Sequence, residues 1–233
     1  NARYSAAEAL YKQSLKKRRE LHESDNLSTA KTLHSLAALY LKQSNYPASM
    51  HIYRDVLEMY EKLRGAEHPE TAKALNSIAE LYYAQARYLE AEPLYQRALE
   101  IHKKVYGVEH IDTALSLNSL ARLYTDMGKL TEAEPLYLTA LIFLEKSAGR
   151  NSPDTITVVG NLATLYDRQG RHVEAEALHT RALQARTKIF GPHHPDTADA
   201  LRGLADCYVK QNKLAEAEAR YGEAFKVYEK AFG

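Results

Sequence analysis

The chain lacks the features that secreted and membrane-spanning proteins need. Its single cysteine, Cys207, cannot form an internal disulfide, which is typical of a reducing compartment. Its apolar runs are only a few residues long, against the roughly 20 residues of a transmembrane helix. Its N-terminus does not show the charged-then-apolar pattern of a signal peptide. These absences predict a cytoplasmic, soluble protein with no insertion into a membrane.

An excess of charge of one sign is also missing. The 233 residues include 31 Lys and Arg against 30 Asp and Glu, so the net charge is +1 and we expect no nucleic-acid partner. The hydrophobic share of 45% and the charged share of 26% indicate a globular protein of one or two domains. Because the chain begins at Asn1 rather than methionine, we expect it to be a fragment of a longer protein.

Motifs for catalysis and cofactor binding are absent. The sequence contains no G-x-x-x-x-G-K-[ST], G-x-G-x-x-G, G-x-S-x-G or H-E-x-x-H, so we expect neither an enzyme nor a cofactor. Cys207 falls within a helical pattern beside an alanine and is interpreted as a packed thiol. The 17 tyrosines recur at helical spacing, which favours a repeat core over a base-stacking surface.

The ten histidines could suggest a metal site. However, His68, His110 and His194 occupy equivalent positions in successive segments, so they do not converge on one ion at about 2 Å. We interpret them as helix caps and surface residues and predict no metal.

A regular repeat organises the chain. Gly65, Gly107, Gly149, Gly191 and Gly233 are evenly spaced and define a 42-residue period. They mark five full repeats preceded by the second half of another: 1–22 (half repeat), then 23–64, 65–106, 107–148, 149–190 and 191–232. Together these predict one repeat domain over residues 1–233.

Each repeat shows the apolar spacing of two helices. Leu75, Ile78, Ala79 and Tyr82 follow the i, i+3, i+4, i+7 pattern and predict a first helix, helix A. After a break at residues 85–87, the run from Tyr88 to Ala98 has the same spacing and predicts helix B. The junctions from B to the next A carry glycine followed by HPET, HIDT, SPDT or HPDT, which are helix stop and start signals.

Small residues indicate how the helices pack. An alanine recurs in every helix A, where a larger side chain would widen the usual axis separation of about 8–10 Å, and a tyrosine three residues later fills the neighbouring space. One repeat cannot bury its own apolar faces, so we expect stacking into an all-α, right-handed superhelical solenoid. Pro93 and Pro135 interrupt the helix B pattern, and we expect them near the first turn with at most a small bend.

These residues resemble the tetratricopeptide signature over essentially the whole chain. The 42-residue period, the G-x-x-H-P-x-T junction and the strings LNSIAELY, LNSLARLY and AEPLYQRALEI are similar to the kinesin light chain subgroup, with nephrocystin-type and bacterial relatives. His179, where the other repeats have tyrosine, and Gly160, Arg202 and Gly203 depart from that pattern. The resemblance implies that the A helices line a concave groove that holds peptides.

The candidate binding residues lie on helix A, off the core stripe. Side-chain amides there offer both donor and acceptor to a peptide backbone. The basic residues exceed the acidic ones in the first three full repeats, which favours an acidic peptide; the alternative is an ordinary solvated face. The candidates are Lys31, His34, Leu41, Lys73, Asn76, Glu80, Tyr83, Asn118 and Arg122.

Two functions remain open. The first is a kinesin light chain-like adaptor that binds a short acidic segment of a protein partner. By the resemblance, this segment would carry a tryptophan flanked by acids, and the partner would belong to a motor or cytoskeletal cargo adaptor complex. The second is a structural scaffold that associates with itself through the repeat ends, without a dedicated peptide groove.

Overall fold

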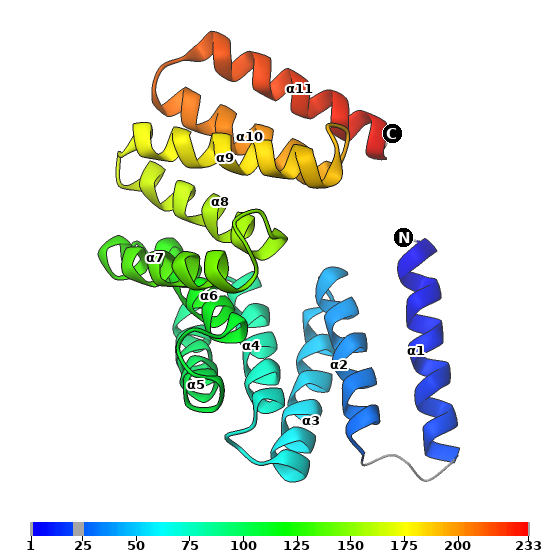
Figure 1. The fold of residues 1–233 in the computed structure, drawn as a ribbon. Helices are drawn as coiled ribbons and strands as arrows, with labels where there is room; N and C mark the ends of the chain where they lie inside the picture. Colours follow the sequence, from blue (N-terminus) through cyan, green and yellow to red (C-terminus); the bar gives the residue numbers. More distant parts are fainter. Residues whose placement is uncertain (1, 21–25, 233) are drawn as a thin grey trace. The chain divides into compact units, whose positions relative to one another are not determined.

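The computed structural model describes residues 2–20 and 26–232. Within these residues there are eleven helices, arranged as sequential antiparallel pairs (Figure 1), so the predicted all-α fold of helix-turn-helix repeats is confirmed. The helices are α1 (Ala2–Glu20), α2 (Leu27–Lys42), α3 (Tyr46–Arg64), α4 (Pro69–Ala84), α5 (Tyr88–Tyr106), α6 (Ile111–Asp126), α7 (Leu130–Ser147), α8 (Pro153–Arg168), α9 (His172–Phe190), α10 (Pro195–Lys210) and α11 (Leu214–Phe232).

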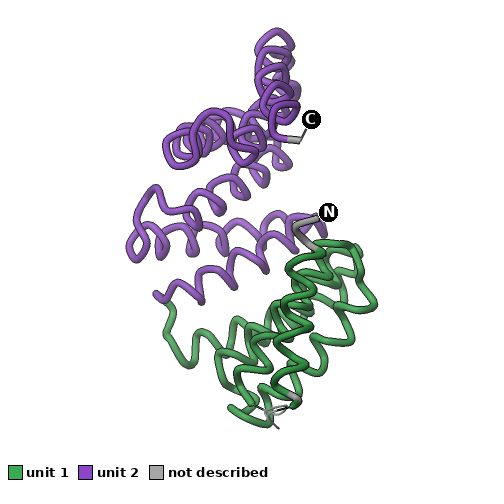
Figure 2. Tube along the Cα trace, turned by 90° about the vertical axis from the view of Figure 1, so that its right-hand side faces the viewer, with its two compact units in different colours: residues 1–108 green, residues 109–233 purple. Residues whose placement is uncertain are grey.

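The helices form two compact units (Figure 2). Unit 1 covers residues 1–108 and contains α1 to α5, whereas unit 2 covers residues 109–233 and contains α6 to α11. Within each unit, every helix packs against the next helix along the chain. In unit 1 the A helices α2 and α4 also contact each other, and in unit 2 α8 contacts both α6 and α10. The single domain over residues 1–233, with its repeat bounds and its right-handed superhelix, stays a prediction.

The core of each repeat is a small residue on helix A beside an aromatic residue on helix B. The recurrent helix A alanines have no exposed surface: Ala37, Ala79, Ala121, Ala163 and Ala205. On helix B, Tyr53, Tyr95 and Tyr137 are only 2%, 0% and 1% exposed. The alanine lets the paired helices approach closely, and the tyrosine ring fills the space beside it.

The junction from helix B to helix A closes on itself through side chains. The Thr71 hydroxyl donates a hydrogen bond of 2.8 Å to the carbonyl of Gly65, and His68 Nδ1 accepts one of 3.2 Å from the amide of Glu70. Thr155 and Thr197 repeat the threonine contact, and His110 and His194 repeat the cap. The prediction that these histidines cap helices is therefore confirmed.

The prolines within helix B lie deeper than we expected. Pro93 and Pro135 are the sixth residues of α5 and α7, so they lie in the second helical turn, and the placement near the first turn was wrong. Each helix starts at the residue after the turn, as the apolar spacing predicted for helix B, and continues through its proline. The cost is one lost backbone hydrogen bond per helix.

The turn from helix A to helix B requires a left-handed residue. Gly128 and Gly170 supply it in two repeats, whereas Ala86 has a φ of 56° at the equivalent position.

The left-handed conformation at residue 86 costs a residue with a side chain about 1–2 kcal/mol. Glycine avoids this cost, but the larger chain entropy that it loses on folding offsets about 0.5–1 kcal/mol of the gain. Ala86→Gly should therefore stabilise the protein by about 0.5–1 kcal/mol, measured as a higher urea midpoint. Gly128→Ala is the reverse control and should lower the midpoint; a lower midpoint for Ala86→Gly would contradict this account of the turn.

Candidate functional site

The predicted binding residues of unit 1 lie on two neighbouring helices. Those on α2 and α4 define the helix-A face of unit 1: Lys31, His34, Leu41, Lys73, Asn76, Glu80 and Tyr83. Two polar contacts join the helices at this face. Lys31 Nζ lies 3.0 Å from Glu70 Oε1, and His34 Nε2 lies 2.9 Å from the Ser77 hydroxyl oxygen. The structure therefore places α2 and α4, which carry the seven residues, side by side.

The two lysines of this face differ in their charge environment. Lys31 is paired with Glu70, which also lies 3.7 Å from the Arg64 guanidinium. Lys73 is exposed, and its ammonium makes no hydrogen bond or ion pair with any residue that the structure describes. Lys73 therefore carries the less compensated positive charge of the two.

His34 acts as a polar link between repeats. Burial, and secondarily the charge of Lys73, lowers the pKa of His34 below its ordinary value. Its ring makes an edge contact with Tyr53, with the ring centroids 5.3 Å apart. A neutral, half-buried imidazole bonded to Ser77 contributes no positive charge to a ligand at neutral pH.

The remaining residues of the face are partly engaged in the fold. Glu80 accepts a hydrogen bond of 2.8 Å from the Tyr95 hydroxyl, and Leu41 packs against the buried cluster around Ala37 and Tyr53. The ring of Tyr83 lies 5.7 Å from that of Tyr88. Asn76 is half-buried. These side chains are held in place by the repeat, which pre-organises the face.

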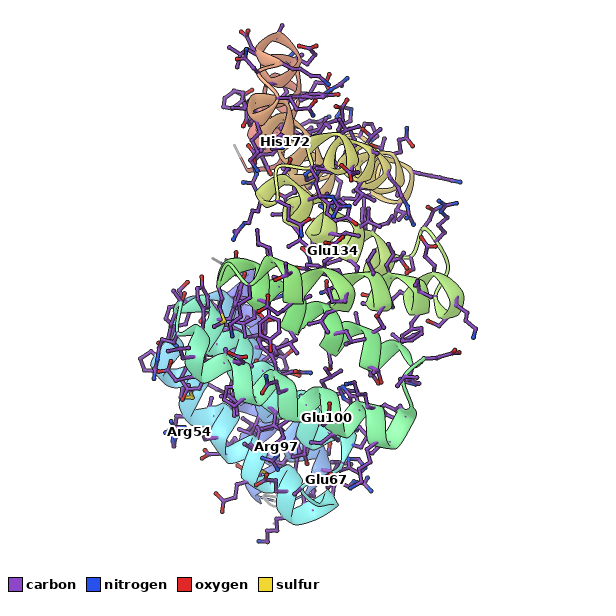
Figure 3. The ribbon with its side chains drawn as sticks, turned by 90° about the vertical axis from the view of Figure 1, so that its left-hand side faces the viewer. Arg54, Glu67, Arg97, Glu100, Glu134 and His172 are labelled. Atoms are coloured by element: carbon purple, nitrogen blue, oxygen red, sulfur yellow. The ribbon has the colours of Figure 1, made fainter. Side chains whose placement is uncertain are left out.

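The helix-B surface of unit 1 carries paired and unpaired charges. Arg97 pairs with Glu61 at 2.8 Å and Lys104 with Glu67 at 3.1 Å, whereas the exposed Arg54 and Lys62 of α3 pair with no residue that the structure describes. Arg97 and Glu67 are labelled in Figure 3. Exposed pairs of this kind contribute little to stability, about 0–1 kcal/mol each, but they leave less unbalanced charge for a ligand.

The two predicted site residues of unit 2 lie on α6. Asn118 Oδ1 accepts a hydrogen bond of 2.9 Å from Asn161 on α8, and Arg122 is half-buried. Nearby, the Arg168 guanidinium donates to the carbonyl of Thr125 at 2.8 Å and also pairs with Asp126. The A helices of unit 2 are thus joined by polar contacts, as those of unit 1 are.

A buried carboxylate in unit 2 was not predicted from the sequence. Asp167 is bonded to His179 Nε2 at 3.0 Å and to His172 Nδ1 at 3.3 Å, and Lys210 lies 3.7 Å away. Burial by itself raises the pKa of Asp167. The hydrogen bonds from His179, Cys207 and His172 lower it by more than burial raises it, so the pKa of Asp167 lies below its ordinary value. The sequence did carry a sign of this cluster, because residue 179 is a histidine where helix B of the other repeats has a tyrosine.

Cys207 lies against this cluster. It has no exposed surface, and its Sγ lies 3.6 Å from the carbonyl of His172, so the predicted packed thiol is confirmed. Burial raises the pKa of the Cys207 thiol to about 11, which keeps it protonated at neutral pH.

Among the described residues, no three His, Cys, Asp or Glu side chains are grouped so that they could hold a metal. Nor is any described helix long and apolar enough to cross a membrane.

A family model described as tetratricopeptide repeat matches the chain at residues 1–62, 48–101, 70–146, 112–188 and 154–230. The chain belongs to the tetratricopeptide repeat family. The recognition made from the sequence is thereby confirmed, and this tetratricopeptide protein is a protein-interaction module of a generally non-enzymatic scaffold family. No match to the chain was found among curated proteins.

Solved structures share the tetratricopeptide fold. BtubC (BKLC) from P. vanneervenii is 24% identical with a TM-score of 0.79, over 99% of this chain and 92% of that one. A putative kinesin light chain repeat protein of Podospora anserina is 23% identical with a TM-score of 0.70, over 86% and 95% of the two chains. A Rap protein complexed with competence and sporulation factor is 19% identical with a TM-score of 0.72, over 89% and 57%. At these identities the likeness concerns the fold.

Gly203 makes room for the His179 ring in this tetratricopeptide protein. A Cβ added at Gly203 would lie 3.1 Å from His179 Nδ1, and Asp167 holds that ring in place. Gly160 also lies within a helix but has open space around it.

Gly160→Ala should therefore stabilise the protein by about 0.5–1 kcal/mol through helix propensity, whereas Gly203→Ala should destabilise it. Thermal unfolding would measure both.

A second background isolates the cause of that difference. In a His179→Ala variant the obstructing ring is gone, so adding Gly203→Ala should raise the stability of the double variant above that of His179→Ala alone. If Gly203→Ala were stabilising in the wild-type background, the packing of Gly203 against His179 would be refuted.

Proposed function

We propose that this tetratricopeptide protein binds an extended acidic segment of a partner protein along the helix-A face of unit 1. Lys73 is the observation that carries this proposal. Its ammonium is exposed on α4 and has no acidic partner among the described residues. A carboxylate of the ligand would supply the missing countercharge.

Lys31 supports the same choice of ligand. Its side chain is 58% exposed although it is paired with Glu70. An ammonium has three donor protons, so Lys31 can bind a second carboxylate while it keeps the first. His34 adds no charge but fixes the spacing between α2 and α4 through Ser77. The positive charge that attracts the ligand is therefore concentrated on two lysines.

The rest of the face offers backbone and apolar contacts. The side-chain nitrogen of Asn76 can donate to a peptide backbone, and Tyr83 and Leu41 offer apolar surface for an aromatic anchor such as tryptophan. In unit 2, Asn118 and Arg122 present the same chemistry on α6. Among proteins of similar fold, a Rap regulator was solved in complex with the Phr* peptide, which supports peptide binding as a use of this fold.

The similarity of fold to kinesin light chain-like proteins supports an adaptor role with a motor or cytoskeletal cargo complex as the partner. The scaffold alternative is favoured by a different observation, the exposed apolar side chains of α11, which belong to unit 2 and not to the helix-A face of unit 1.

A charge reversal tests the acidic ligand. Lys73→Glu should weaken binding of a synthetic peptide with a tryptophan flanked by Asp and Glu by about tenfold at low salt, or about 1.4 kcal/mol. Binding would be measured by fluorescence anisotropy. The difference should shrink as salt is added, because exposed charges are screened within about 10 Å at 0.1 M ionic strength.

Lys62→Glu is the matched control, because Lys62 is an exposed lysine in the last turn of the B helix α3. It changes the net charge of the protein equally and should leave the peptide affinity within about twofold. Equal losses in both variants would indicate non-specific attraction and reject the helix-A face as the site.

A further inference from the structure

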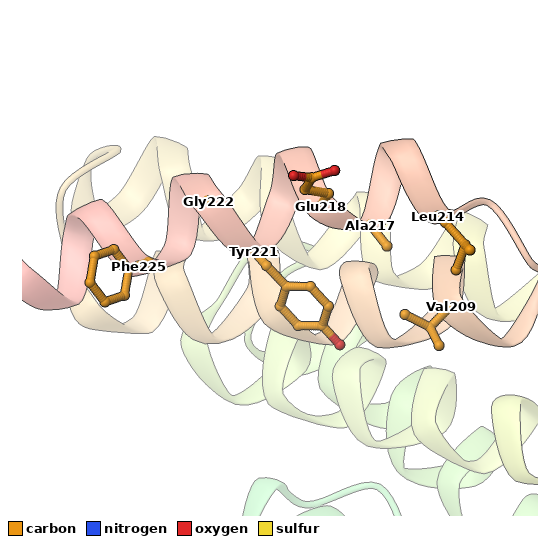
Figure 4. Close-up of a pocket in the computed structure, with 7 residues that line it drawn as sticks. All are labelled: Val209, Leu214, Ala217, Glu218, Tyr221, Gly222 and Phe225. Carbon is orange, nitrogen blue, oxygen red and sulfur yellow. The ribbon is translucent and has the colours of Figure 1, made fainter.

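Unit 2 contains a groove lined by the B helices α9 and α11 and by α10, here called the α9–α11 groove. Its volume of about 530 Å³ falls within the range of small-molecule sites, about 300–1,000 Å³. Leu183, Leu201 and Val227, one from each helix, form its apolar floor. The groove shares no residue with the exposed surface around Tyr221 and Phe225 that Figure 4 shows, so it is a separate site on α11.

The hydroxyl groups in the α9–α11 groove are already bonded. Thr187 donates a hydrogen bond of 2.8 Å to the carbonyl of Leu183, and Thr197 donates one of 2.8 Å to the carbonyl of Gly191. Neither hydroxyl proton is therefore available to a ligand. The floor favours an apolar group, and polar recognition has to come from the charged side chains of the groove.

In two other pairs of B helices an arginine crosses the corresponding position. Arg97 of α5 donates to Glu61 of α3 at 2.8 Å, and Arg181 of α9 donates to Glu145 of α7 at 2.6 Å. Each guanidinium also donates to a backbone carbonyl of the junction between the two repeats. The arginine thus forms a bridge from one B helix to the B helix before it.

The α9–α11 groove lacks this bridge. Glu223 and Thr187 follow Arg181 and Glu145 by one full repeat, and a carboxylate and a bonded hydroxyl cannot replace the ion pair. The Glu223 carboxylate instead accepts hydrogen bonds of 2.9 Å from Arg220 of its own helix through both oxygens. Because the bridge runs to the preceding B helix, the open groove does not depend on any element after α11.

A second charge pair is also missing from the groove. Near the ends of α5 and α7, a lysine pairs with a glutamate of the preceding junction: Lys104 with Glu67, and Lys146 with Glu109. The equivalent residues in the α9–α11 groove are Lys230 and His193. A histidine carries no negative charge in either protonation state. Lys230 is exposed and makes no hydrogen bond or ion pair with any residue that the structure describes.

The groove consequently has an excess of positive charge. Its basic residues Arg220, Lys226 and Lys230 face a single carboxylate, Glu223, which bonds Arg220. Lys226, like Lys230, has no acidic partner within the part of the chain that the structure describes. Side chains four residues apart share one face of a helix, with Cβ atoms about 5–6 Å apart. A carboxylate has two oxygens and can accept a hydrogen bond from each ammonium.

We propose that the α9–α11 groove binds a small organic carboxylate with an apolar body, such as a short acyl chain. The apolar body covers Leu183, Leu201 and Val227, and the carboxylate binds Lys226 and Lys230. An inorganic anion would leave the apolar floor exposed to water, and a neutral hydrocarbon would leave both ammonium groups without a countercharge. This site goes beyond the acidic-peptide function proposed above, since it lies in unit 2 and takes a small molecule.

Octanoate is the probe that tests this site in the whole protein. Isothermal titration calorimetry should show saturable binding with a Kd below about 1 mM. Octanol lacks the charge and acetate lacks the apolar chain, so each should bind at least about tenfold more weakly than octanoate. The proposal is overturned if octanoate does not saturate the protein, or if either control ligand binds as tightly.

A charge reversal tests the lysines. Lys230→Glu should weaken octanoate binding about tenfold, because repulsion replaces a charge-assisted hydrogen bond. Lys188→Glu is the matched control, since Lys188 is the equivalent exposed lysine of α9 and does not line the groove. The control makes the same change in net charge and should leave the affinity within about twofold. Equal losses in both variants would reject the groove as the site.

Restoring the missing bridge tests the groove itself. Thr187→Glu combined with Glu223→Arg introduces between α9 and α11 the pair that Glu145 and Arg181 form between α7 and α9. The new arginine should cross the groove and abolish octanoate binding. The double variant gains one positive charge, so non-specific attraction would instead predict tighter binding. Circular dichroism should match that of the wild-type protein, and retained binding would overturn the proposal.

Two measurements separate this site from the proposed peptide site. Lys73→Glu should leave the octanoate affinity within about twofold, because Lys73 belongs to unit 1; a larger loss would place the ligand on the wrong unit. The acidic tryptophan peptide should not displace octanoate. Displacement would assign the α9–α11 groove to a protein segment and contradict the small-molecule proposal.

Discussion

The close approach of helix A to helix B is the constraint on which the rest of the structure depends. The alanine of each helix A is fully buried, and at an axis separation of about 8–10 Å no larger side chain fits there. This contact places the helix B tyrosine in the core and leaves the opposite stripe of helix A for polar side chains. The same spacing brings His34 within bonding distance of Ser77 and Asn118 within bonding distance of Asn161.

The polar residues of the A helices therefore divide into two groups. One group ties neighbouring repeats together, as His34 does through Ser77 and Arg168 does through Thr125. The other group, represented by the exposed ammonium of Lys73, has no bonded partner within the described residues.

Much of the fold could be predicted from the sequence because its causes are local or periodic. The regular repeat located the helices, and the junction motif identified His68 as a cap before Glu70. The contacts between repeats could not be predicted in this way. The pairing of Lys31 with Glu70 and the cluster around Asp167 depend on side-chain rotamers and on distances between helices, which periodicity does not specify. Pro93 was expected near the first turn because proline is best tolerated there, yet α5 begins at Tyr88 as predicted and continues through the proline in its second turn.

The most direct test of the central claim is to map bound peptides by amide chemical shifts after an unbiased peptide-display selection against the whole protein. If the A helices carry the binding surface, acidic peptides should be enriched, and their shifts should concentrate on α2 and α4 around Lys73. Shifts confined to the B helices α3 and α5 would contradict the account, because they would place the binding surface on the B helices and not on the A helices.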